Sequence, residues 1–180
     1  MTDHGENDEG ELPKAKEPKK SQESNIGANF RSIRVKLKQP FKLYNLKTFP
    51  ETTVRLTKDQ AQAYYKQMQT IRHLEVASGA LYKEKVIRGF CHLYSGQEAC
   101  AVGIKAAMRD QDNVITAHRC HGWCYMMNIS SAGILTELTG RKTGCQRGKG
   151  GSMHMYSSHF YGGNGIVGSQ VGFHLLFVFL

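Results

Sequence analysis

Apolar positions recur with a helical period in the stretch that follows Thr57. They appear every three or four residues from Ala61 to Ala77, a spacing that places them on one face of a helix. Thr57 and Gln60 match a capping box, in which each side chain accepts a hydrogen bond from the other residue's backbone N–H. The pattern predicts a long amphipathic helix that runs to about Tyr82.

A second capping box is predicted at Ser95–Glu98, opening a helix of small side chains that continues through Ala107. A turn then leads into Val114–Thr116, a short apolar run that is typical of a strand. Small side chains allow this helix to approach its neighbours closely.

A third helix is predicted from Ala132 to Leu138, capped by Ser130 or Ser131 and closed by Gly140. Helix, strand and helix in alternation indicate an α/β fold. We expect a parallel sheet flanked by helices.

The chain before this domain divides into two polar regions. Residues 1–29 are rich in Asp, Glu and Lys and bury too little apolar surface to order themselves, so we expect a disordered head. Residues 30–56 form a basic extended arm, and the alternation in residues 32–38 predicts a strand at a sheet edge or against a partner. The folded domain is expected at residues 57–171, followed by a separate tail at 172–180.

Charge and cysteine content narrow the classes of function. The net charge of +9 favours an anionic partner such as nucleic acid, a membrane surface or a phosphorylated ligand, or it serves solubility alone. Few aromatic residues lie between the basic residues after position 140, which argues against a base-stacking surface for nucleic acid.

Five cysteines, an odd number, fit free thiols in a reducing compartment. No apolar run reaches the roughly 20 residues that span a bilayer.

Three motifs suggest ligands but are weak. Gly163–Gly168 matches the dinucleotide pattern G-x-G-x-x-G without the acidic residue that should follow it. Gly144–Lys149 resembles a phosphate-binding loop but lacks the hydroxyl residue that should follow the lysine. Residues of the types that bind zinc cluster in one short loop, at His118, Cys120, His121 and Cys124. A second cluster at the spacing of a zinc finger is missing, so free thiols and packed histidines are the favoured interpretation.

Two residues stand at places where ligands commonly bind. His92 lies just before the predicted N-terminus of a helix, a position that attracts anions. Arg119 follows the predicted strand, and in α/β sheets ligands lie beyond the carboxyl ends of strands. A guanidinium group there suits a phosphate, although an ion pair with a nearby carboxylate would place it equally well.

Several longer motifs, in order, resemble the alpha subunits of the decarboxylating component of the pyruvate dehydrogenase complex. The resemblance covers residues 54–171, and the Gly150–Met155 string favours the pyruvate enzyme over its branched-chain relative. The segments that carry it are Ile87–Leu93, Gly96–Ala99, Ile115–Gly122, Glu137–Lys142, Lys149–Met155 and Phe160–Gly168.

The resemblance implies the N-terminal portion of a thiamine diphosphate-binding fold. It implies oxidative decarboxylation of pyruvate, with transfer of the acetyl unit to a lipoyl-bearing acyltransferase component. Two alpha and two beta subunits would form a heterotetramer in the mitochondrial matrix. The acidic N-terminus does not look like a mitochondrial presequence, and the sequence leaves open whether the basic stretch after it acts as a targeting signal.

Carried over by residue, the resemblance places Arg119 on the cofactor diphosphate. His118 stands where the family has a tyrosine that contacts the same group. Gly165 and Val167 would offer backbone groups to the aminopyrimidine ring, which backbone can approach where side chains are absent.

The resemblance also makes His92 the active-site histidine and lets Ser157 line the site through its backbone. After Val171 the family continues with the residues that hold Mg²⁺, whereas residues 172–180 here do not match them. We therefore expect an incomplete chain without metal ligands of its own, inactive and poorly folded alone.

Other functions remain open at this point. One is a non-catalytic fragment or paralogue that only binds the beta subunit. Another is the alpha subunit of acetoin dehydrogenase or of a branched-chain 2-oxoacid dehydrogenase.

Overall fold

The computed structural model describes residues 33–36, 42–45, 47–48 and 52–172. The chain divides into two units, residues 1–30 and residues 31–180, and only the second contains described residues. The disordered head expected at residues 1–29 and nearly all of the tail therefore lie outside the described residues.

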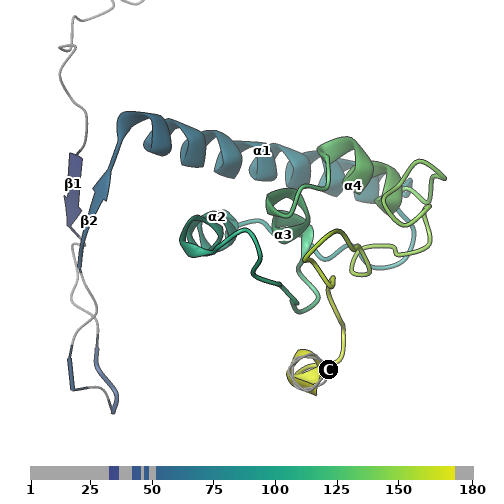
Figure 1. Ribbon diagram of the computed structural model, residues 1–180. Coiled ribbons are helices and arrows are strands. Elements are labelled where there is room, and N and C mark those ends of the chain that lie inside the picture. Colours follow the sequence, from purple (N-terminus) through teal and green to yellow (C-terminus); the bar gives the residue numbers. More distant parts are fainter. Residues whose placement is uncertain (1–32, 37–41, 46, 49–51, 173–180) are drawn as a thin grey trace, which may run out of the picture. The chain divides into compact units, whose positions relative to one another are not determined.

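Helix α1, Lys58–Lys83, confirms the predicted long helix and its capping box (Figure 1). The Thr57 hydroxyl accepts from the Gln60 N–H at 3.1 Å, and the Gln60 side chain accepts from the Thr57 N–H at 3.0 Å. The buried positions of the helix have the spacing of a single face. A carboxylate and a hydroxyl are buried among its apolar side chains: the buried residues are Ile71, Leu74, Glu75 and Ser78.

Helix α2, Glu98–Ala107, begins later than the predicted capping box, so the expected cap at Ser95 is wrong. The reason lies in the carboxylate of Glu98, which pairs with the Arg72 guanidinium of α1. The same carboxylate accepts the backbone N–H of Gly96 at 3.0 Å. Because the ion pair holds the Glu98 carboxylate toward α1, this carboxylate accepts the N–H of Gly96 and not that of Ser95.

The Arg72–Glu98 ion pair predicts a specific loss of stability in acid. The hydrogen bond from Arg72 lowers the pKa of Glu98 from its ordinary 4.5 to about 2. A carboxyl group with a depressed folded pKa stabilises the fold above its unfolded pKa and loses that contribution as pH falls through the folded value. Arg72→Gln should lower the urea midpoint at neutral pH, and the deficit should shrink between pH 4.5 and about 2. A deficit that does not change with pH would contradict this assignment.

Helix α3, His121–Met126, is not among the predicted helices, whereas α4, Ser131–Leu138, confirms the third one. The Ser130 hydroxyl caps α4 by accepting the Gly133 N–H at 3.0 Å. Gly140 follows the helix with a φ of +69°, the left-handed conformation expected of a glycine that closes a helix.

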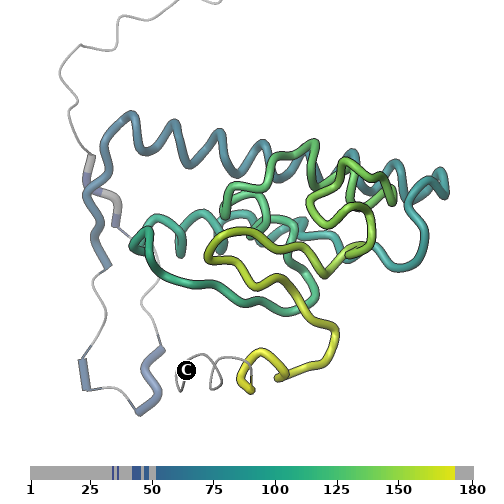
Figure 2. The backbone as a smooth tube through the Cα atoms, turned by 45° about the vertical axis from the view of Figure 1, so that its right-hand side comes forward, coloured from purple at the N-terminus to yellow at the C-terminus, as the bar shows by residue number. Residues whose placement is uncertain are grey.

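The three shorter helices pack against α1, and α3 also packs against α2 and α4. They lie along one side of α1 in two views of the chain (Figures 1 and 2). Two groups of buried side chains fill the space between them. The larger includes Leu74, Val114, Cys124, Ile134, Met155 and Phe160, and the smaller includes Ile71, Tyr94, Ala101, Val102 and Met126.

Strands β1, Ile33–Lys36, and β2, Thr53–Leu56, pair antiparallel, with Val35 opposite Val54. The predicted strand in residues 32–38 is confirmed for Ile33–Lys36, and its partner strand comes from the same chain. The basic side chains of Arg34 and Lys36 are exposed.

The predicted strand at residues 114–116 forms a single parallel bridge, between Val114 and Phe160. Val114 donates to the His159 carbonyl and accepts from the Tyr161 N–H, both at 2.8 Å. A parallel sheet needs further strands beside this pair, with helices covering both faces. Residues 52–172 contain no such further strand, so the parallel sheet stays a prediction.

Glu137 of α4 is fully buried and holds the glycine-rich loop that follows the helix. Its carboxylate accepts three backbone N–H groups, from Gln146 at 2.7 Å, Gly148 at 2.9 Å and Gly150 at 2.6 Å. Gly150 fits because a Cβ there would lie 1.9 Å from a backbone carbonyl oxygen. The buried Glu137 carboxylate thus holds the backbone of a loop that has no helix or strand of its own.

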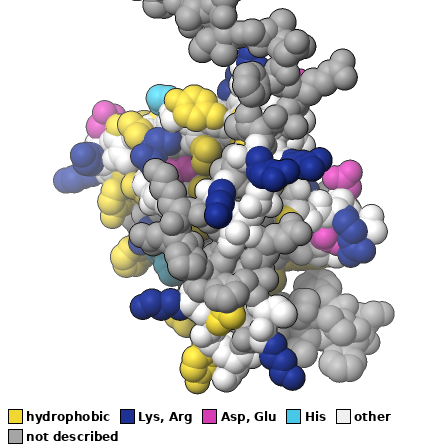
Figure 3. Space-filling model, turned by 90° about the vertical axis from the view of Figure 1, so that its left-hand side faces the viewer, with side chains coloured by type: hydrophobic (Ala, Val, Ile, Leu, Met, Phe, Trp, Pro, Cys, Tyr) yellow, Lys and Arg dark blue, Asp and Glu magenta, His cyan; other side chains and the backbone are white. Residues whose placement is uncertain are grey.

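Basic side chains project from the same loop into solvent, at Arg141, Lys142, Arg147 and Lys149. On the face of the molecule shown in Figure 3, Lys and Arg side chains are dispersed among apolar and neutral groups. A dispersed distribution differs from the continuous basic groove that tracks a nucleic-acid backbone.

Candidate active site

His92 lies at the centre of the candidate site. Its backbone N–H donates to the Ser152 hydroxyl at 2.8 Å, and its ring lies edge-on to His118, with centroids 5.3 Å apart. Its Nδ1 atom is buried without a hydrogen-bond partner among the described residues. Burial, followed by the charges of His118 and Arg119, lowers the pKa of His92. The ring is therefore neutral at neutral pH, and its Nδ1 atom makes no hydrogen bond within the described chain.

Arg119 lies beyond the Val114 bridge, as the sequence predicts for a ligand-binding residue. One guanidinium N–H donates to the Leu93 carbonyl at 2.5 Å, and the other N–H groups have no partner within the described part of the chain. Arg119 and His118 line a cavity of about 410 Å³. The guanidinium therefore keeps donors for an anion while it is tied to the residue next to His92.

The segment that begins at Gly162 lies against the loop that carries Arg119. The Thr116 N–H donates to the Gly162 carbonyl at 3.0 Å. A Cβ at Gly163 would lie 2.6 Å from the Ala117 carbonyl oxygen, so this contact requires glycine. The glycine-rich motif thus brings two backbone segments together.

Gly165 and Val167 lie farther along this segment, and both are exposed. The Val167 side chain is 95% exposed, and neither residue lines the cavity beside Arg119. The structure thus brings His92, His118 and Arg119 together and leaves Gly165 and Val167 on an uncovered stretch of backbone.

Ser157 is held within a turn. Its backbone N–H and C=O both pair with Phe160 at 3.1 Å, and its hydroxyl donates to the Met127 carbonyl at 2.7 Å. Its backbone polar groups are therefore occupied, and a role in lining the site remains a prediction.

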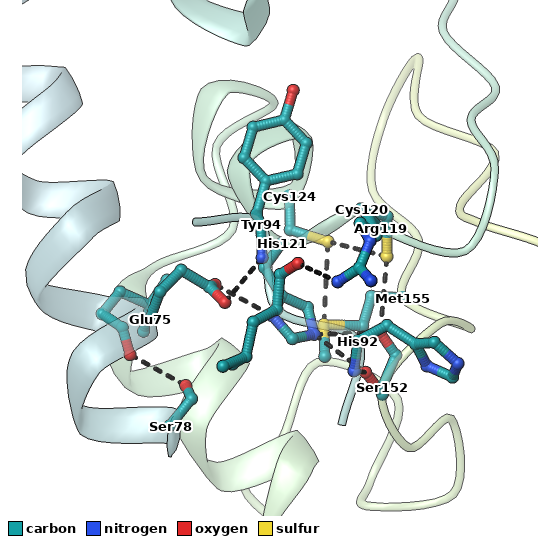
Figure 4. A network of polar contacts seen from close by, with 12 residues as sticks. Glu75, Ser78, His92, Tyr94, Arg119, Cys120, His121, Cys124, Ser152 and Met155 are labelled. Carbon is teal, nitrogen blue, oxygen red and sulfur yellow. Dashed lines mark hydrogen bonds and ion pairs between the residues drawn. The ribbon is translucent and has the colours of Figure 1, made fainter. Parts of the chain in front are cut away.

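A buried polar network behind His92 escaped sequence reasoning (Figure 4). Glu75 bonds His121 Nδ1 at 2.9 Å through one oxygen and accepts the Tyr94 N–H at 2.8 Å through the other. His121 Nε2 lies 3.0 Å from the Ser152 carbonyl oxygen. The side chains of Glu75 and His121 are fully buried. The one available signal was the position of Glu75 within the buried stripe of α1.

The residues weighed for zinc do not form a metal site in the structure. Across the described ranges, no group of three or more His, Cys, Asp or Glu side chains could hold a metal ion. Cys120 and Cys124 are buried with their sulfurs 3.9 Å apart, and all five cysteines are free thiols. Within the same ranges, no helix has the length and apolarity needed to cross a membrane.

Comparison with known proteins identifies a family match. Residues 66–175 match the family described as dehydrogenase E1 component. This region includes His92, His118, Arg119, Gly165 and Val167.

Curated relatives extend the match over most of the chain. It is 63% identical over 132 residues to pyruvate dehydrogenase E1 component subunit alpha type II, mitochondrial, of Ascaris suum, covering 73% of this chain and 34% of the relative. It is 61% identical over 132 residues to the probable mitochondrial alpha subunit of Caenorhabditis elegans, covering 73% and 33%. The somatic mitochondrial alpha subunit of Homo sapiens is 54% identical over 129 residues, covering 72% and 33%. The chain spans about a third of the length of these relatives.

Proposed function

The chain belongs to the dehydrogenase E1 component family, and from this premise we propose that it is part of the alpha subunit of a pyruvate dehydrogenase. The protein would decarboxylate pyruvate oxidatively with thiamine diphosphate and pass the acetyl unit to a lipoyl group. The convergence of His92, His118 and Arg119 at the end of the Val114 bridge carries the proposal. The names of the relatives support pyruvate as the substrate.

The residues of the site fit the diphosphate end of this cofactor. Arg119 has N–H groups without partners in the described chain and lines the cavity with His118. A guanidinium presents paired donors in the geometry that phosphate oxygens accept. Arg119 and His118 would therefore hold the diphosphate, and the accompanying Mg²⁺ would take its protein ligands from outside residues 57–171.

The cofactor ring would lie against the exposed backbone at Gly165 and Val167. Both residues are exposed, and among the described residues only the Met153 side chain lies close to the position of a Cβ at Gly165. When bound, thiamine diphosphate supplies the electron sink for decarboxylation, and the protein supplies binding, orientation and electrostatics.

His92 would face the substrate and move a proton through its imidazole ring. Its lowered pKa keeps the ring neutral near pH 7, where a neutral imidazole can accept a proton or donate one through its other nitrogen. The basic environment of Arg119 and His118 attracts an anionic 2-oxoacid toward the same place.

The proposal extends to partners and location. A beta subunit would complete an alpha2-beta2 heterotetramer, and a lipoyl-bearing acyltransferase would receive the acetyl unit. The relatives are named as mitochondrial E1 alpha subunits, which supports the mitochondrial matrix for this protein.

Arg119→Ala tests whether the cofactor binds here. In the complete alpha chain assembled with its beta subunit, the variant should raise the apparent dissociation constant of thiamine diphosphate about 10- to 150-fold, the effect of losing a charged hydrogen bond of about 1.5–3 kcal/mol. Activity measured against cofactor concentration gives the constant. The matched control is Arg141→Ala, an exposed arginine on the loop after α4, which should leave it unchanged. Equal constants for Arg119→Ala and the unmodified protein would remove Arg119 from the site.

A further inference from the structure

The backbone around His92 is held at three consecutive residues. The His92 N–H donates to the Ser152 hydroxyl, the Leu93 carbonyl accepts from Arg119, and the Tyr94 N–H donates to Glu75. Figure 4 shows these contacts converging from different parts of the chain. Because residues 92–94 have no helix or strand of their own, these contacts determine where the His92 ring lies.

His121 joins two of these three holding points. Its Nδ1 atom bonds Glu75 at 2.9 Å, and its Nε2 atom lies 3.0 Å from the carbonyl oxygen and 3.1 Å from the hydroxyl oxygen of Ser152. The residues lie on α1, at the start of α3 and in the loop after α4. One side chain therefore ties together the parts of the fold that surround His92.

The carboxylate of Glu75 favours the protonated form of His121. In that imidazolium form both ring nitrogens donate, Nδ1 to the Glu75 carboxylate and Nε2 to the Ser152 carbonyl oxygen. Burial lowers the pKa of His121, but the hydrogen bond and charge of Glu75 outweigh this effect and raise it. The result is a buried ion pair in which every donor on the ring is used.

We propose that Glu75, His121 and Ser152 form a buried relay that positions His92 for the reaction. All three side chains are buried and bond to one another or to the backbone of residues 92–94, so they are positioning residues rather than catalytic ones. The proposal rests on the proposed function only in assigning the reaction to His92. The relay itself rests on the contacts of the described residues.

Two consequences distinguish this relay from a merely structural ion pair. Displacement of a reacting group by about 1 Å can cost about 100-fold in rate, so loosening the relay should lower kcat more than it raises KM. Burial and the charges of His118 and Arg119 lower the pKa of His92 most, and the charge of His121 lowers it further, so loss of that charge should raise slightly the midpoint at which His92 titrates. The other charged and titratable groups that face the two histidines are Glu75, His118, Arg119 and Cys120.

The test compares Glu75→Gln, Ser152→Ala and Ser152→Thr in the complete alpha chain assembled with its beta subunit. Steady-state kinetics with pyruvate give kcat and KM. The rate at which diethyl pyrocarbonate modifies His92, followed by mass spectrometry across pH, gives its titration midpoint without requiring turnover. Glu98→Gln is the matched control, because it breaks a different ion pair, the one between Arg72 of α1 and Glu98 of α2, which does not involve His121.

Glu75→Gln and Ser152→Ala should lower kcat about 10- to 100-fold with little change in KM, and Ser152→Thr should restore most of it. Glu75→Gln should also raise the His92 midpoint, which Glu98→Gln should leave in place. An unchanged kcat and midpoint in folded Glu75→Gln and Ser152→Ala would overturn the relay. If the unmodified assembly fails to turn over pyruvate, the proposed function fails, and the midpoint alone then decides for or against the relay.

Discussion

A His92→Ala variant of the complete alpha chain, assembled with its beta subunit, should lose about 100- to 10,000-fold in kcat for pyruvate, the usual contribution of a positioned acid–base group. Its binding of thiamine diphosphate should change little, because His118 and Arg119 carry the proposed contacts with the diphosphate. Nδ1 of His92 is buried and unpartnered in the described chain, so alanine breaks no hydrogen bond at that atom and removes the ring contacts with Phe90 and His118.

The control for this variant is His73→Ala, which changes an exposed histidine on α1. It should retain full turnover. Steady-state kinetics with saturating cofactor separate the two variants. A His92→Ala protein with kcat within a few-fold of the unmodified one would exclude His92 from the chemistry.

The largest loss of stability is expected from Glu137→Ala. The carboxylate of Glu137 accepts three backbone N–H groups in the loop after α4. Leaving a buried donor unsatisfied costs about 1–3 kcal/mol, and a typical domain has only about 5–15 kcal/mol of net stability. We expect the variant to unfold at a much lower urea concentration or to fail to accumulate as folded protein.

Glu137→Gln is the matched comparison, because it keeps one accepting oxygen. Two of the three N–H groups share a single carboxylate oxygen, so a correctly turned amide preserves those two bonds and loses the third. Its urea midpoint should lie between those of Glu137→Ala and the unmodified chain. Equal midpoints for the two variants would show that the backbone bonds to Glu137 contribute little.

The sequence predicted a helix correctly where neighbouring residues determine its cap and its buried face. The Thr57 cap and the apolar spacing of α1 are properties of neighbouring residues, and both are confirmed. The cap at Ser95 failed because Arg72, distant in sequence, recruits the Glu98 carboxylate. Helix α3 carries no side-chain cap, so the local sequence contained no signal for its start.

In the candidate site too, the sequence predicted what depends on neighbouring residues and missed what depends on distant ones. His92 and Arg119 were predicted from their places before a helix and after a strand, and the structure brings them together through Leu93. The partnership of Glu75 and His121 spans 46 residues and follows from how α1 meets α3, which periodicity does not encode. Periodicity assigned the buried face of α1 to apolar side chains and passed over the carboxylate within it.

We propose that this chain forms part of a thiamine diphosphate site that acts on pyruvate. The most direct measurement is the release of CO₂ from pyruvate by the complete alpha chain with its beta subunit, with and without thiamine diphosphate and Mg²⁺. 2-Oxoisovalerate also releases CO₂ and is assayed in the same way, whereas acetoin is cleaved without release of CO₂ and is followed by the reduction of an artificial electron acceptor. We expect cofactor-dependent turnover with the highest kcat/KM for pyruvate. Turnover that does not depend on thiamine diphosphate, or a preference for 2-oxoisovalerate or acetoin, would contradict the proposal.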